Sequence, residues 1–225
     1  MISVIIPALN EARGLPACLD TLLQQQGEFE VLLADGNSED GTAEVAGRYP
    51  GVRVLTAPRG RALQMNAGAA AAAGELLLFL HADTQLPPGA ISRLNALEQD
   101  PDFQAGGFLH RFSGTQWPLR FVSWLHNQRC RLTGVFYGDQ AMVVRRSMFK
   151  LAGGFPEQPI LEDVLLSEKL LQLTRPRLLD PPVVTDSRKF ERMGPWISLW
   201  RCLLILTCYE LRLPIRGRAF FTPVR

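Results

Sequence analysis

The stretch ISVIIPALNE, residues 2–11, sets the fold that this chain is expected to adopt. Its β-prone run Ile2–Ile6 predicts a buried strand that ends at Pro7, and residues 12–25 follow with leucines at helical spacing. The same pattern recurs as apolar runs at 30–33, 52–55 and 75–80 and as helical stretches at 42–48, 61–73 and 89–99. This strand–helix alternation predicts an α/β fold with a Rossmann-like, mostly parallel sheet flanked by helices.

The second half of the sequence is less regular. It predicts strands at 103–112 and 141–144 and helices at 117–132 and 163–173. No repeat or low-complexity linker separates the halves, so we expect one domain over 1–186. Within it we distinguish a first half, about residues 1–100, and a second half, about residues 101–186. A basic, apolar helical tail follows over 187–225.

Composition excludes several classes of protein. The chain has 225 residues, of which 47% are apolar and 20% charged, as in folded globular proteins. Its net charge of +2 is too small for a dedicated nucleic-acid binder. Residues 187–225, however, hold eight Lys or Arg against two Asp or Glu, a net charge of +6, whereas residues 1–186 carry −4. We therefore expect the tail to meet an anionic partner.

The tail also contains a long apolar stretch. From Met193 to Tyr209 only Arg201 is charged, and these 17 residues are too few to span a bilayer. The pattern favours an amphipathic helix on an anionic membrane surface, and a core helix or a homodimer contact are the alternatives. The expected interfacial anchors are Trp196, Trp200, Arg212, Arg216 and Arg218.

Cysteine spacing and the N-terminus bear on localisation. The four cysteines show no C-x-x-C spacing, which argues against a zinc site or a disulfide framework. We see no signal-peptide pattern. We therefore expect the protein in the cytoplasm. The amphipathic helix adds the expectation that it attaches peripherally to the inner face of the plasma membrane.

Polar residues follow three of the predicted strands, at the edge where parallel sheets bind ligands. They are residues 7–11, 35–42 and 81–84. Taken locally, Glu11 can simply stabilise a helix start, and 34–42 can be a plain strand-to-helix turn. His81 and Asp83 can be a divalent-metal pair or a hydrogen-bonded pair. Arg61 can bind a phosphate, or it can be a solvated loop arginine. Asn66 can bind a sugar, or it can pack on the Ala-rich helix.

The order and spacing of these segments resemble family 2 glycosyltransferases of the GT-A fold, over residues 1 to about 175. The likeness extends to YGDQ at 137–140, GGF at 153–155 and ILEDVLL at 160–166. The run GRALQMNAGA at 60–69 and the His81-Ala82-Asp83 variant are most similar to the subfamily known as arsenosugar-biosynthesis glycosyltransferases.

The resemblance implies that the first half of the domain, about residues 1–100, is a nucleotide-binding donor half and that the second, about residues 101–186, is an acceptor half. It also implies roles for particular residues. Asp83, with His81 in the first position of a D-x-D motif, would hold Mn²⁺ or Mg²⁺ on the donor diphosphate. Asp163 would be the base that activates the acceptor, and Glu162 is the neighbouring candidate. The donor-binding residues that the resemblance implies are Pro7, Ala8, Asn10, Glu11, Asp35, Gly36 and Asp83. Arg61 and Asn66 are added to them for the local reasons given above.

These roles predict an inverting, metal-assisted hexosyltransferase that takes a UDP- or GDP-linked sugar to an unidentified acceptor hydroxyl. A degenerate member that binds a nucleotide sugar or a partner without transfer is the alternative, since His81 and Gly36 stand where the family often has Asp. A sugar nucleotidyltransferase is disfavoured because no Gly-rich phosphate loop follows the first strand. A dinucleotide-dependent dehydrogenase is excluded because G-x-G-x-x-G is missing there.

Overall fold

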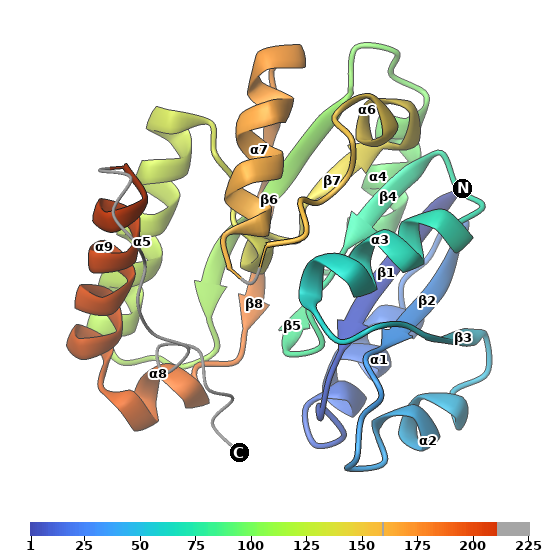
Figure 1. Ribbon diagram of the computed structural model, residues 1–225, viewed down its shortest axis with the longest axis horizontal. Coiled ribbons are helices and arrows are strands. Elements are labelled where there is room, and N and C mark those ends of the chain that lie inside the picture. The colour runs from blue at the N-terminus through green and yellow to red at the C-terminus, as the bar shows by residue number, and fades with distance from the viewer. Residues whose placement is uncertain (159, 211–225) are drawn as a thin grey trace.

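The computed structural model describes residues 1–158 and 160–210, and it contains an eight-stranded sheet in the order β3-β2-β1-β4-β7-β6-β8-β5 (Figure 1). The strands are β1 (Ile2–Ala8), β2 (Phe29–Asp35), β3 (Val52–Thr56), β4 (Leu76–Phe79), β5 (Thr84–Gln85), β6 (Ala105–Phe112), β7 (Val143–Arg145) and β8 (Arg177–Thr185). The helices are α1 (Leu15–Leu23), α2 (Thr42–Gly47), α3 (Arg61–Ala71), α4 (Ala90–Glu98), α5 (Trp117–Thr133), α6 (Arg146–Leu151), α7 (Glu162–Leu173), α8 (Arg188–Met193) and α9 (Pro195–Glu210), with a 3₁₀ turn at Gly138–Gln140.

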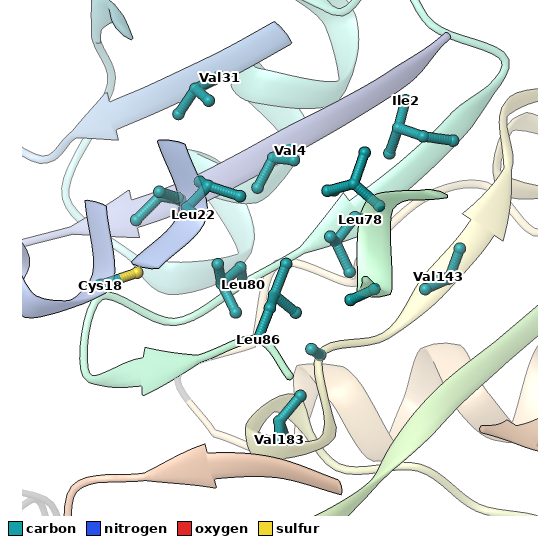
Figure 2. Close-up of a cluster of buried hydrophobic side chains, with 14 of the residues drawn as sticks. Ile2, Val4, Cys18, Leu22, Val31, Leu78, Leu80, Leu86, Val143 and Val183 are labelled. Carbon is teal, nitrogen blue, oxygen red and sulfur yellow. The ribbon is translucent and has the colours of Figure 1, made fainter. Parts of the chain in front are cut away.

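The donor half contains the parallel sheet that the sequence predicts. β1 pairs in parallel with β2 and β4, and β2 with β3. Alternate residues of β1 point to opposite faces. Val4 packs with Leu22 of α1 and Leu78 of β4 in one core cluster, shown in Figure 2, whereas Ile5 joins a second cluster with α3. Helices therefore cover both faces, and the carboxyl ends of β1 and β2 lie side by side.

The acceptor half departs from a simple parallel sheet. β7 runs antiparallel between β4 and β6, β8 runs parallel to β6, and β5 closes the sheet antiparallel to β8. The sequence analysis did not predict β8, because Pro181 and Pro182 lie inside it. Between the pairs Phe108↔Leu179 and His110↔Val183 the register shifts, so the prolines occupy an irregularity where the ladder is interrupted.

The C-terminal elements lie on one side of the acceptor half. α9 packs against α5 and α8, and α5 packs against β6 (Figure 1). Within residues 1–158 and 160–210, no helix has the length and apolar character needed to cross a membrane. The predicted anchors Arg212, Arg216 and Arg218 lie outside the described residues. The boundary near residue 186 stays a prediction.

Candidate active site

The loops after β1 and β2 are tied together by hydrogen bonds. The backbone N–H of Asn10 donates to Ser38 Oγ over 3.0 Å, and Asn10 Oδ1 accepts from the N–H of Glu39 over 2.9 Å. The N–H of Glu11 donates to Thr42 Oγ1 over 2.9 Å. The second loop therefore holds the Asn10-Glu11 turn in place, although Asn10 adopts a positive φ of 57°.

Other residues predicted to bind the donor shape the floor beneath these loops. Asp35 is buried, and its carboxylate accepts hydrogen bonds from the N–H and the Oγ of Ser38. Gln64 of α3 donates to the carbonyl oxygens of Ala8 and Ala34, joining the ends of β1 and β2. A Cβ at Gly36 would lie 3.0 Å from Gln64 Nε2, so the glycine makes room for this tie.

A pocket of about 420 Å³ opens above the loops. Its lining combines carboxylates and arginines from distant parts of the chain: Asn10, Glu11, Arg13, Gly14, Glu39, Asp40, Asp83, Asp186, Arg188 and Arg192. Of the residues predicted from sequence, Asn10, Glu11 and Asp83 meet here. Pro7, Ala8, Asp35, Gly36, Arg61, Asn66 and His81 are not part of this lining within the described chain.

Asp83 shares the pocket with Asp186, which the sequence analysis did not single out. Thr84 of β5 pairs with Thr185 of β8, and the N–H of Asp186 donates to the Asp83 carbonyl over 2.9 Å. Arg188 donates from its backbone N–H and from Nε to the Asp186 carboxylate. Asp186, Arg188 and Arg192 lie more than 90 residues from the Asp83 motif in sequence, so no local spacing pointed to them.

The two carboxylates have the chemistry that Mg²⁺ and Mn²⁺ prefer. Within the part of the chain that the structure describes, no group of three or more His, Cys, Asp or Glu side chains is arranged to hold a metal ion. A cation at Asp83 and Asp186 would therefore need further oxygen ligands from a bound molecule, and a diphosphate offers them.

His81 points toward the acceptor half. A Cβ added to Gly138 would lie 2.7 Å from His81 Nε2 and 3.3 Å from Asp163 Oδ2, so the imidazole and the carboxylate both lie against this glycine. Burial, followed by the charge of Arg61, lowers the pKa of His81. The uncharged imidazole is therefore the favoured form at neutral pH.

Asp163 and Glu162 begin α7, and the two carboxylates have different partners. Asp163 accepts from the N–H of Gly138 over 2.6 Å and from the N–H of Val164 over 2.8 Å. Glu162 is buried and lies 3.3 Å from Nη1 of Arg61. Burial raises the pKa of Glu162, and Arg61 opposes that rise. Arg61 thus joins α3 to α7.

Asn66 also connects the two halves. Its side chain donates to the Phe155 carbonyl over 2.8 Å and accepts from the Phe155 N–H over 3.0 Å. Both polar atoms of Asn66 therefore have protein partners, and the side chain anchors the GGF segment to α3.

A histidine–aspartate cluster, consisting of His110, His126 and Asp139, lies next to this region. His110 Nε2 is 3.7 Å and His126 Nε2 is 3.5 Å from the Asp139 carboxylate, beyond hydrogen-bond length. Burial lowers the pKa of His126 to about 4 and also lowers that of His110. Asp139 belongs to the YGDQ segment, but the two histidines come from β6 and α5, and no sequence spacing links them to it.

Comparison with known structures identifies the fold as GT-A. The mannosyltransferase PcManGT from Pyrobaculum calidifontis, solved with GDP-Man and Mn²⁺, matches with a TM-score of 0.69 and 24% identity, covering 96% of this chain and 65% of that one. S. aureus TarS 1–349 in complex with UDP-GlcNAc matches with a TM-score of 0.69 and 18% identity, covering 96% and 68%. These likenesses confirm the predicted fold.

The family follows from the sequence match. Residues 3–150 match the model of glycosyl transferase family 2, and the chain belongs to that family. A PGL/p-HBAD biosynthesis glycosyltransferase of Mycobacterium tuberculosis is 38% identical over 128 residues, 52% of this chain and 50% of the relative. An undecaprenyl-phosphate 4-deoxy-4-formamido-L-arabinose transferase of Aeromonas hydrophila is 31% identical over 157 residues, 64% and 48%. The chain spans about half the length of these curated relatives.

Proposed function

We propose that this chain transfers a hexosyl group from a UDP- or GDP-linked sugar to an acceptor hydroxyl, with inversion at the anomeric carbon. The observation that carries the proposal is the pocket at the carboxyl ends of β1 and β2, where Asp83 and Asp186 lie beside Arg188 and Arg192. Two structural neighbours, solved with GDP-Man and with UDP-GlcNAc, support a nucleotide-sugar donor.

Each side of the pocket suits one part of the donor. The turn at Asn10 and Glu11 is fixed by its backbone hydrogen bonds, and both residues line the pocket where we place the base and ribose. The guanidinium groups of Arg188 and Arg192 suit the diphosphate, because a planar fork of N–H donors matches phosphate oxygens. The pocket lining therefore supports a nucleotide-diphosphate ligand.

Asp83 and Asp186 are the residues we assign to a divalent cation. Bound Mn²⁺ or Mg²⁺ would supply positive charge that offsets the charge developing on the leaving diphosphate. The sequence analysis paired Asp83 with His81. The imidazole of His81 lies against Gly138, which favours Asp186 over His81 as the ligand beside Asp83.

Asp163 is the proposed general base. Its two backbone hydrogen bonds fix the carboxylate at the start of α7, and lone pairs on both oxygens stay available to an acceptor hydroxyl. A positioned base contributes about 10²–10⁴-fold to rate. Glu162 is the weaker candidate, because its carboxylate is buried against Arg61.

Binding without transfer is the second candidate function. His81 and Gly36 favour it, since both replace acidic residues frequent in the family, and Asp83, Glu162 and Asp163 count against it. Membership of the arsenosugar subfamily also stays a proposal, carried by residues 60–69 and the His81-Ala82-Asp83 motif. The acceptor is not identified by either argument.

A donor screen tests the proposal. Thermal unfolding and product formation are measured for the full chain with UDP- and GDP-sugars, in Mn²⁺ and in EDTA. A true donor at a hundredfold excess over its Kd should stabilise the fold by about 2.7 kcal/mol. Asp83→Ala should abolish that stabilisation, and the exposed Asp102→Ala is the matched control.

The outcomes separate the two functions. Stabilisation by a donor that never yields a glycosylated or hydrolysed product would support binding without transfer. Full activity in EDTA would contradict the metal assignment. No stabilisation by any donor, together with no product, would contradict both functions.

A further inference from the structure

All four tryptophans of the chain lie on α5 and α9, and all are exposed. Trp117 is 67%, Trp124 55%, Trp196 48% and Trp200 62% accessible. Single exposed apolar residues are normal on a protein surface. Tryptophan, however, is on average a highly buried residue, so four exposed tryptophans on two adjacent helices are unusual. Such a surface needs a partner that favours indole rings.

These side chains form one continuous aromatic surface. The rings of Trp117 and Trp196 lie 5.3 Å apart, and Phe121 lies 6.1 Å from Trp196 and 5.9 Å from Trp124. Residues 117, 121 and 124 share one face of α5, because they are four and three positions apart. Trp196 and Trp200 are four positions apart and so share one face of α9, which packs on α5 (Figure 1).

The charged residues nearest the tryptophans along both helices are arginines, and the acidic residues Glu168 and Glu210 lie at the far end of α9, where Tyr209 donates to Glu168. Between Gly114 and Gly138 the chain has three arginines and no Asp or Glu. Arg120 and Arg131 are exposed on α5. From Gly194 to Tyr209 the only charged residue is Arg201. The surface therefore complements an anionic partner.

We propose that the aromatic surface of α5 and α9 docks onto an anionic lipid bilayer, with both helices lying flat at the headgroup level. Tryptophan is the residue that most favours the membrane–water interface, and nearby arginines add attraction to anionic lipids. A second copy of the chain fits less well, because a two-fold dimer would bring together two copies of one surface that both carry Arg120 and Arg131. This proposal does not depend on glycosyl transfer.

Intrinsic fluorescence gives a direct test, because every tryptophan belongs to the proposed surface. The full chain is titrated with phosphatidylcholine vesicles, with and without phosphatidylglycerol, and sedimentation measures the bound fraction. We expect a blue shift of emission and co-sedimentation with the anionic vesicles, and much weaker binding to the neutral ones.

Substitutions on α5 and on α9 test whether both helices contribute to vesicle binding. Trp124→Ser on α5 and Trp200→Ser on α9 should each lower vesicle affinity about tenfold. Arg120→Gln and Arg131→Gln should each lower it about fivefold, on anionic vesicles only. Leu151→Ser, on α6 and 67% exposed, is the matched control and should bind like the wild type. Circular dichroism verifies that each variant is folded.

Three results would overturn the proposal. The first is emission and sedimentation that do not respond to either vesicle. The second is vesicle binding that Trp124→Ser leaves unchanged, which would place the contact on the C-terminal tail alone. The third is a dimer in light scattering that Trp124→Ser dissociates while no vesicle binding is found.

Discussion

The loops of the donor half and the histidine–aspartate cluster of the acceptor half use their polar groups in opposite ways. After β1 and β2, side chains such as Asn10 and Asp35 bond to neighbouring backbone or hydroxyl groups. In the cluster, both ring nitrogens of His110, Nε2 of His126 and Oδ1 of Asp139 have no hydrogen-bond partner among the described residues. Such atoms are costly to bury, and binding sites are where proteins tolerate them. The loops after β1 and β2 are therefore fixed by their own hydrogen bonds, whereas the cluster keeps buried polar atoms that have none within the described chain.

The largest effect is expected from a substitution of Asp163, which tests whether the acceptor half supplies the general base. Asp163→Asn removes the proton acceptor and should reduce kcat by about 10²–10⁴-fold. Since an amide can serve only one of the Gly138 and Val164 N–H groups as acceptor, we also expect a loss of about 1 kcal/mol in stability. Donor affinity should stay unchanged, because the donor pocket does not include Asp163. Steady-state kinetics and calorimetric titration measure the two quantities.

Near-normal turnover in Asp163→Asn would move the base elsewhere. Glu162→Gln is then the next variant, with Asp139→Asn after it. A loss of donor affinity equal to the loss of kcat would instead make Asp163 part of donor binding, and the contrast between the halves would fail.

The histidine–aspartate cluster should also make the fold sensitive to acid. Burial lowers the pKa of His126 from 6.5 to about 4 in the folded chain. Between these values the unfolded chain binds a proton that the folded chain does not, so stability is full above pH 6.5 and falls as the pH drops. The loss is roughly 3 kcal/mol at most. Urea unfolding at a series of pH values measures it.

His126→Gln should flatten this dependence, because the amide does not titrate. If the variant loses stability between pH 6.5 and 4 as steeply as the wild type, His126 is not the responsible group. His110, whose pKa burial also lowers, would then be tested by the same substitution.

A smaller effect is expected where the two halves touch. At Gly138 an added Cβ would press on the imidazole of His81, so Gly138→Ala should cost about 1–3 kcal/mol by overpacking. Gly47 in α2 has nothing within 4 Å of the same position, and Gly47→Ala should stabilise by about 0.5–1 kcal/mol. Thermal melts of the pair compare a crowded glycine with an open one. Equal shifts in both would mean that His81 can move aside.

Prediction from sequence succeeded where structure is local. The strands β1, β2 and β4 and the helices between them follow from periodicity, because each βα unit buries its own apolar face. The sequence pointed to Asp83, which lines the pocket, because it follows a strongly apolar strand. The pattern failed at β8, where two prolines mask a strand that pairs with β6 across a register shift.

The missed part of the site has a similar cause. The pairing of β5 with β8 brings three residues to the pocket: Asp186, Arg188 and Arg192. A strand of only two residues, such as β5, has no sequence pattern by which it could be predicted. The histidine–aspartate cluster likewise depends on the packing of α5 against β6. A site whose residues come together through long-range strand pairing or helix packing cannot be predicted from the pattern of any single sequence segment.

The pairing of β5 with β8 has a consequence for synthesis of the chain. Thr84 and Thr185 face each other 101 residues apart, their hydroxyl oxygens 3.2 Å from one another. Chains emerge from the ribosome N-terminus first, at about 5–20 residues per second. The parallel strands of the donor half can assemble early, but the pocket lacks one wall until Arg192 has emerged. A nascent chain therefore spends seconds with the parallel strands assembled and the pocket incomplete. Under the proposed function, it can bind the donor fully only after Arg192 has emerged.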